Sequence, residues 1–296
     1  MANVYETITD RIIKQLEAGT APWHKPWAFR GDAGLPRNLR TLKVYRGINV
    51  WILMSAGYSS PYFLTFKQAQ ELGGNVRKGE KGLPVVFWKF GEYEQDNQDT
   101  GKAKKHDSVM VRYYTVFNAV QCENLQVVPV APPDPYPDVP AIDLCEQTVA
   151  GWTSRPTIRE GCDRASYHKT LDYINMPSRS SFDKSEEYYS TLFHELTHST
   201  GHPNRLNRQT LTDFEAFGDS NYSREELAAE MGAAFLCGFT GIENRTIENS
   251  AAYLASWLKA LKEDHRMVVI AASQAQKAVE LILGLSHHNG SEGSAA

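Results

Sequence analysis

The most constraining stretch of this 296-residue sequence is residues 188–201, which contain the pattern His-Glu-x-x-His. Apolar side chains recur there at the spacing of an amphipathic helix, with Asp183 as the expected N-cap and Glu186 as its capping-box partner. On such a helix His194 and His198 lie one turn apart on the same face, so both imidazoles can bind one metal ion. The stretch therefore predicts a helix that carries two ligands of a metal site.

The residue types also predict a chemistry. In zinc sites of this kind the histidines hold Zn²⁺, the ion lowers the pKa of a bound water, and Glu195 is placed to activate that water as a general base. The alternative is a chance match on a solvated helix face, expected in roughly one chain in a hundred of this length. Gly201, a suitable helix C-cap just after the motif, favours the metal site. We expect Zn²⁺, and another divalent transition metal such as Mn²⁺ also suits these ligands.

A catalytic zinc site needs a third protein ligand. The longer pattern HExxHxxGxxH would put a histidine at position 204, but this chain has Asn204 there. The best candidate lies on a second predicted helix that begins at Ser223 and presents Glu226 and Glu230 on one face. By analogy with glutamate-type zinc peptidases, Glu226 is the ligand, and Glu230 orients one histidine through its outer ring nitrogen. Two alternatives remain open: a capping-box role for Glu226, and ligation by His202.

The charge distribution indicates two parts with different roles. Residues 1–90 carry 13 Lys and Arg against 6 Asp and Glu, whereas the other 206 residues carry 18 against 29. Six prolines between residues 126 and 142 rule out a continuous helix or a central strand there, so we expect a linker. It would separate a domain at 1–125 from a domain at 143–286, with a disordered tail at 287–296.

The N-terminal domain is expected to mix helices and strands. Apolar spacing indicates a helix over residues 3–18 and a short helix at 64–72 that Thr65 caps. Residues 83–90 and 109–117 alternate as the strands of a hairpin, with a hydrophilic loop at 92–108.

The C-terminal domain is expected to be mainly helical with a small sheet, which makes the whole chain α+β. Besides the two motif helices, helical patterns cover residues 142–154 and 250–283, and short strands are expected at 165–168 and 173–177. The four cysteines are widely spaced without a CxxC pair, which is typical of reduced thiols in a cytoplasmic protein. Neither a signal sequence nor an apolar run of membrane-spanning length is visible, so we expect no membrane partner.

Basic and aromatic residues are interleaved in the N-terminal part, a pattern that suits single-stranded nucleic acid. Basic side chains neutralise phosphates, and aromatic faces stack on unpaired bases at about 1–3 kcal/mol per base. The recognition helix or zinc-finger signature of a duplex reader is not seen. The alternative is that the tryptophans anchor the core and that the basic turn at 77–82 is only a solvated connection. The candidate DNA contacts are Trp23, Lys25, Trp27, Arg37, Asn38, Arg40, Lys43, Tyr45, Arg46, Asn49, Lys67, Gln68, Arg77, Lys78 and Lys81.

Together these motifs resemble those of plasmid-borne antirestriction proteins of the ArdC type, whose N-terminal domain is shared with conjugative primases. The matching residues are Pro22–Trp27, Asn38, Tyr45–Asn49, Leu64–Gln68, Gly73–Gly82, Val116–Asn118 with Gln121, and His194–Arg205. The resemblance implies that residues 1–125 bind single-stranded DNA and that the remainder is a zincin-like metallopeptidase.

The same resemblance implies a role in conjugation. The protein would shield incoming plasmid DNA from the recipient's restriction enzymes, which makes a host restriction-system protein a candidate target of the peptidase. An alternative from another class is a protein that coats single-stranded DNA and whose metal site is structural or catalytically silent.

Overall fold

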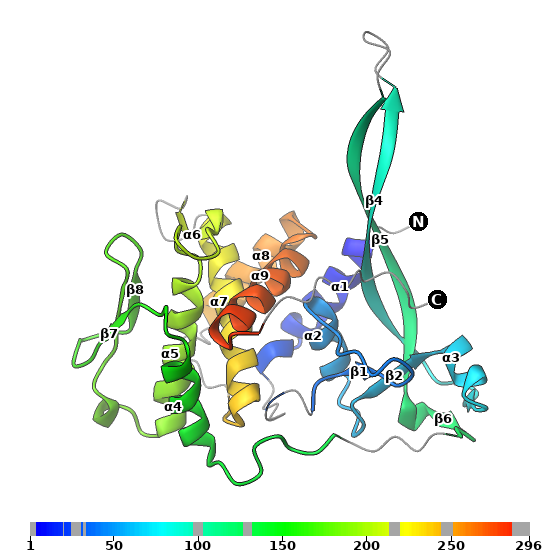
Figure 1. Ribbon diagram of the computed structural model, residues 1–296, viewed down its shortest axis with the longest axis horizontal. Helices are drawn as coiled ribbons and strands as arrows, with labels where there is room; N and C mark the ends of the chain where they lie inside the picture. Colours follow the sequence, from blue (N-terminus) through cyan, green and yellow to red (C-terminus); the bar gives the residue numbers. More distant parts are fainter. Residues whose placement is uncertain are drawn as a thin grey trace.

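The computed structural model describes residues 4–19, 21–24, 31, 34–96, 103–126, 132–212, 220–243 and 251–285. Its N-terminal part is built around a four-stranded sheet, and its C-terminal part is mainly helical with a three-stranded sheet (Figure 1). The predicted α+β class is therefore confirmed. The tail expected at residues 287–296 lies outside the described residues.

The N-terminal sheet has the strand order β1-β2-β5-β4. These strands are β1 (Arg37–Asn38), β2 (Tyr62–Thr65), β4 (Leu83–Asp96) and β5 (Ala103–Asn118). β4 and β5 pair antiparallel and form a long ribbon that extends away from the rest of the molecule (Figure 1). The hairpin was predicted, but its strands continue through residues 92–96 and 103–108, which were expected to be loop. Backbone pairing needs no apolar face, so the hydrophilic sequence does not end the ribbon.

Short elements surround this sheet. They are α1 (Val4–Glu17), η1 (Pro22–His24), α2 (Ile48–Met54), α3 (Phe66–Glu71), β3 (Asn75–Val76), η2 (Ala119–Gln121) and β6 (Cys122–Glu123). The predicted cap of α3 is confirmed, because the Thr65 hydroxyl accepts a hydrogen bond from the Gln68 backbone and the Gln68 side chain accepts one from the Thr65 N–H.

The C-terminal part contains a three-stranded sheet of order β7-β9-β8 beside its helices. Its elements are α4 (Ala141–Gly151), β7 (Thr157–Arg159), β8 (Ser166–His168), β9 (Tyr173–Asn175), η3 (Arg179–Ser181), α5 (Ser185–Ser199), α6 (Gln209–Thr212), α7 (Ser220–Thr240), α8 (Ala251–Glu263) and α9 (Met267–Ile282). β8 and β9 were predicted, whereas β7 was not. The helical pattern at 250–283 is two helices, α8 and α9, separated by residues 264–266.

Both motif helices begin elsewhere than predicted. α5 begins at Ser185, and its N-cap Lys184 makes no side-chain capping bond, so the predicted Asp183 cap is wrong. Instead, the negative charges of Glu186 and Glu187 in the first turn stabilise the helix by attraction to the positive end of its dipole. α7 begins at Ser220, which places Ser223 inside the helix, where its Oγ lies 3.2 Å from Ser256 Oγ. Glu226 therefore has no capping-box role.

One apolar core includes residues of both parts of the chain. Trp23 packs edge-on against Trp257, with ring centroids 5.8 Å apart, and Trp51 packs against Phe235 at 6.3 Å. Helix α1 contacts α8 and α9 in the same core. In the predicted linker, Tyr136 packs on Phe239 at 6.0 Å. The N-terminal sheet and the metal helices thus share a packed interior, while the boundaries at residues 125 and 142 stay predictions.

None of the helices within the described ranges is long and apolar enough to cross a membrane.

Candidate metal centre

Helices α5 and α7 approach each other closely where the two motifs meet. A Cβ atom at Gly232 of α7 would lie 2.5 Å from Cγ2 of Thr197 on α5, a separation that real Cβ atoms do not show. Only glycine at this position permits such an approach. The close packing brings the face of α5 that carries the histidines against the face of α7 that carries its glutamates.

Three buried side chains converge at this contact. Nε2 of His194 and Nε2 of His198 are 3.0 Å apart. The two carboxylate oxygens of Glu226 lie 3.5 Å from these nitrogens, Oε2 from His194 and Oε1 from His198. Among the described residues, these three form the group whose ligand atoms all lie within 4.8 Å of one another. His202 is outside this group, and its Nδ1 accepts a hydrogen bond from the Asn204 N–H at 3.2 Å.

The outer ring nitrogen of each histidine faces a second glutamate. Oε1 of Glu230 lies 3.3 Å from Nδ1 of His194, and Oε1 of Glu225 lies 3.1 Å from Nδ1 of His198. A carboxylate beside Nδ1 favours the tautomer that carries its proton there, which leaves the Nε2 lone pair for a metal. Both lone pairs and the Glu226 carboxylate then point at one place.

The distances between the ligand atoms fit a metal ion. Ligands about 2.0–2.1 Å from a tetrahedral zinc are about 3.3 Å from each other. The observed separations of 3.0 to 3.5 Å agree with that value. The donor set of two imidazoles and one carboxylate suits Zn²⁺ and other divalent transition metals.

Arg208 and Glu225 extend the site behind His198, and the sequence did not single out either. The Arg208 guanidinium donates to both oxygens of Glu225, from Nε at 3.1 Å and from an Nη at 2.5 Å. It also donates to the backbone carbonyls of Thr197 and His198, at 2.8 and 3.2 Å, at the end of α5. A Cβ on Gly201 would lie 2.9 Å from this guanidinium, so glycine there leaves room for it. Arg208 thus joins the end of α5 to Glu225 on α7.

The charges around the two histidines favour the binding of a cation. Burial alone would lower the pKa of His194, but hydrogen bonds with Glu226 and Glu230 raise it well above its ordinary value. The pKa of His198 is also raised, since Glu226 and Glu225 outweigh its burial. Burial would raise the pKa of Glu225, but Arg208 holds it well below the usual range. The carboxylates of Glu225, Glu226 and Glu230 outnumber the single guanidinium of Arg208, and a divalent ion would offset this excess of negative charge.

Glu195 lies between the two histidines in sequence and is buried at 8% exposure. It lies on α5, directly after His194 in the sequence. Its role as a general base stays a prediction.

Five of the candidate DNA contacts are buried, which contradicts a direct contact role for them. Trp23 is 0% exposed and packs on Trp257, so no base can stack on it. Tyr45 is buried between Phe63 and Phe87. The general reason is that large aromatic side chains gain more from the core than from solvent.

The other three buried candidates are amides that hold the scaffold together. Asn49 on α2 donates to the Val86 carbonyl at 2.8 Å and accepts from the Val86 N–H at 2.7 Å. Asn38 accepts from the backbone of Arg40 at 3.0 Å and donates to Gln68 at 3.0 Å. Since Gln68 also completes the cap of α3, these amides are committed to protein partners.

The remaining candidates that the structure describes are cationic and, apart from the half-buried Arg37, exposed. Arg40 pairs with Glu71, Arg46 with Glu280, and Arg77 with Glu80. Lys25 and Trp27 lie outside the described residues. The exposed lysines of this set are Lys43, Lys67, Lys78 and Lys81.

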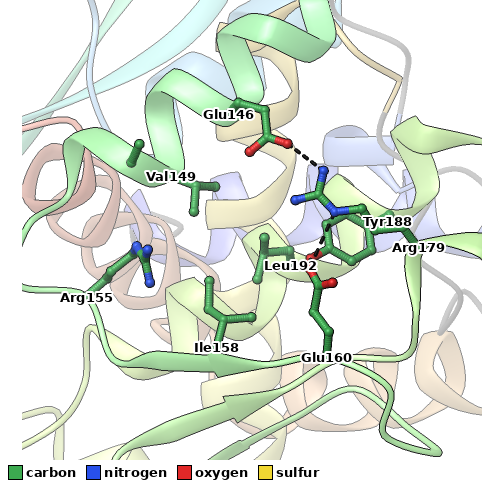
Figure 2. A pocket seen from close by; sticks show the side chains of 9 residues that line it. Glu146, Val149, Arg155, Ile158, Glu160, Arg179, Tyr188 and Leu192 are labelled. Carbon is green, nitrogen blue, oxygen red and sulfur yellow. Dashed lines mark hydrogen bonds and ion pairs between the residues drawn. The ribbon is translucent and has the colours of Figure 1, made fainter.

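A pocket of about 240 Å³ lies on another side of α5 and contains none of the metal ligands (Figure 2). Tyr188 and Leu192 line it, and helix periodicity turns them more than about 100° away from His194. Arg179 lies between two carboxylates there, 2.5 Å from Glu146 and 3.4 Å from Glu160. Its charge is therefore already neutralised within the protein.

Comparison with known proteins matches both parts of the chain. Residues 2–117 match the model of the N-terminal domain of anti-restriction factor ArdC, and residues 147–274 match that of a zincin-like metallopeptidase. The Mn(II)-bound crystal structure of the antirestriction ArdC protein from plasmid R388 is 39% identical, with a TM-score of 0.73 over 96% of this chain and 98% of that one. Its metal-free crystal structure is 40% identical, with a TM-score of 0.71 over 95% and 97%.

Two further relatives are matched over very different shares of their own length. A DNA primase TraC of Escherichia coli is 39% identical over an alignment of 297 positions that covers 94% of this chain and 27% of the primase. The present chain thus spans about a fifth to a quarter of the TraC primases that it matches. The protein y4eC of Sinorhizobium fredii, itself uncharacterised, is 34% identical over an alignment of 284 positions that covers 93% of this chain and 90% of y4eC.

Proposed function

Because this chain belongs to the family of ArdC antirestriction proteins, with an ArdC N-terminal domain and a zincin-like metallopeptidase domain, we propose that it protects DNA that enters a new host from restriction. It does so by binding the DNA as a single strand and by metal-dependent hydrolysis of a peptide bond in a protein target. A protein of the host restriction system is the target that this role suggests.

The number of converging ligands is the observation that best supports hydrolysis. Structural zinc sites are closed by four protein ligands, whereas catalytic sites use three and leave one position for water or substrate. Among the described residues, His194, His198 and Glu226 are the three that converge. This count favours a catalytic site over a structural one.

The roles of the residues follow from their positions. His194, His198 and Glu226 would hold the ion, which supplies Lewis acidity and lowers the pKa of a water. Glu195 takes the proton of the attacking water and later passes it to the leaving amine. Glu230 and Glu225 keep the two imidazoles in the tautomer that binds a metal.

Zn²⁺ is the metal that we propose, with Mn²⁺ as the alternative. The nitrogen and oxygen donors accept both, and the Mn(II)-bound relative supports the second. Metal analysis of protein purified without added metal, followed by competition between the two ions, decides between them.

Single-stranded DNA binding rests on the charge of the exposed N-terminal surface. Residues 36–83 contain eight Lys and Arg against two acids, Glu71 and Glu80. The DNA contacts that we retain are Arg37, Arg40, Lys43, Arg46, Lys67, Arg77, Lys78 and Lys81, with Lys25 and Trp27 as predictions from sequence. Binding should prefer single strands over duplex and should weaken steeply with salt. Equal affinity for both forms of DNA in a gel-shift assay would contradict the proposal.

Glu195→Ala separates this proposal from its alternative, a DNA-coating protein with a silent metal site. The variant keeps the three ligands and should bind metal and DNA normally. If hydrolysis is needed, it fails to protect incoming DNA in a transfer assay. Full protection by a metal-loaded Glu195→Ala protein would favour the coating alternative.

A further inference from the structure

Two exposed aromatic side chains lie outside every site described above. Phe66, the first residue of α3, is 49% exposed, and Tyr113 on β5 is 55% exposed. They are the large aromatic residues among the exposed hydrophobic residues that the structure describes. Exposed rings offer faces on which a partner can stack, which makes this place a candidate contact surface.

The strand register places these two rings close to each other along β5. Thr65 of β2 is paired with Val116 of β5, so Phe66 follows at the level of Thr115. Side chains alternate along a strand, so Thr115 and Tyr113 share the face of β5 opposite the buried Val116. Phe66 is the first residue of α3, directly after β2, and α3 lies against β5 in this region (Figure 1).

The surroundings of the two rings are cationic. Lys67 follows Phe66, and its side chain is 72% exposed. The basic turn at residues 77–82 ends beside Thr115, two residues from Tyr113, because a Cβ on Gly82 would lie 2.3 Å from Cγ2 of Thr115. Lys78 and Lys81 of this turn are exposed, and neither has a carboxylate within ion-pair distance among the described residues.

We propose that Phe66 and Tyr113 form a stacking platform for two bases of a single strand, with Lys67, Lys78 and Lys81 binding the adjacent phosphates. This inference rests on the proposed binding of single-stranded DNA and gives it a surface. Exposed rings stack on any unpaired base, and the lysines match a polyanion, whereas paired bases in a duplex hide their faces. The platform thus replaces the buried Trp23 and Tyr45 as the source of stacking.

Fluorescence anisotropy with a labelled oligothymidylate tests the platform on the full chain. We expect Phe66→Ala and Tyr113→Ala each to weaken binding about tenfold, as loss of one stacked base does, with an unchanged salt dependence. Tyr113→Phe keeps the ring and should bind within about twofold of the wild type. Lys78→Ala should instead lower the slope of log affinity against log salt by about one.

An abasic strand of the same length provides the second readout. It keeps the phosphates but offers no base to stack, so wild type, Phe66→Ala and Tyr113→Ala should bind it equally. Leu171→Ala, which removes another exposed hydrophobic side chain at 66% exposure far along the chain, is the matched control and should bind like the wild type. Thermal melting confirms that these surface variants are folded.

Wild-type affinity of both alanine variants for oligothymidylate would overturn the platform and leave single-stranded DNA binding intact. A tenfold loss that persists on the abasic strand would also overturn it, because the rings would then act without bases. Failure of the wild type itself to bind single strands would overturn both the platform and the proposed DNA binding.

Discussion

The guanidinium of Arg208 forms an ion pair with the carboxylate of Glu225 at 2.5 Å, and both side chains are buried. The same carboxylate also faces Nδ1 of His198, one of the three candidate metal ligands. The pair therefore links the loop after the motif helix to the helix that supplies the third ligand.

Removing Arg208 should damage both folding and metal binding. Arg208→Ala leaves a buried carboxylate without its cation, and loss of one partner of a buried pair costs about 3–5 kcal/mol of unfolding free energy. It also frees Glu225 to move away from His198, so metal affinity should fall about 10- to 100-fold. Urea unfolding and calorimetric metal titration measure the two effects. Arg266→Ala, at 69% exposure of the side chain, is the control that should change neither, and a control-like Arg208→Ala would contradict the link.

Enlarging Gly232 should separate the two motif helices. The Cβ of Gly232→Ala would meet Thr197 at 2.5 Å, and overpacking of this kind costs about 1–3 kcal/mol. Because the ligands come from both helices, metal affinity should fall as well. Gly151→Ala is the matched control, since a Cβ there meets nothing within 4 Å. Equal metal affinity of the two variants would show that the close approach is not needed.

Asn49 should prove to be a scaffold residue despite its place in the basic segment. Asn49→Ala leaves the N–H and C=O of Val86 without their partner, which should cost about 2–4 kcal/mol of stability. Affinity for single-stranded DNA, measured at a temperature where the variant is folded, should stay close to that of the wild type. A folded Asn49→Ala protein that has lost DNA binding would restore the direct contact that burial argues against.

The ion pair between Asp172 and Arg205 should make stability depend on pH. Burial alone would raise the pKa of Asp172, but hydrogen bonds from Arg205 and Tyr167 lower it below its ordinary value. A lowered folded-state pKa contributes stability above the unfolded value of about 3.9, and that contribution is lost as pH falls through the folded value. Melting temperatures of wild type and Asp172→Asn should therefore differ at pH 6 and converge in acid. A difference that is constant across this range would contradict the assignment.

The sequence was most informative where function depends on local spacing. His194 and His198 could be predicted as ligands because they lie one helical turn apart. Glu226 could be predicted because its spacing from Glu230 puts both on one face of a helix. Thr65 could be predicted as a cap for the same reason, whereas its capping-box partner Gln68 was assigned to DNA.

The sequence was least informative about contacts between segments that lie far apart along the chain. Glu225 and Arg208 touch His198 only after α5, α7 and the loop between them are packed, and no periodicity in the sequence reports that contact. Trp23 is buried by Trp257 of α8, and Asn49 is bound to Val86 of β4. Both elements are remote from these residues in the sequence. Composition shows that aromatic and basic residues are present, and only the folded structure shows which of them are exposed.

His194, His198 and Glu226 should together hold one divalent ion per chain. Metal content of wild type, Glu226→Ala and Glu195→Ala, measured by elemental analysis after identical purification and with folding checked by circular dichroism, tests it most directly. We predict about one zinc or manganese per chain in the wild type and in Glu195→Ala, and a large loss in Glu226→Ala. Full metal content in a folded Glu226→Ala protein would contradict it.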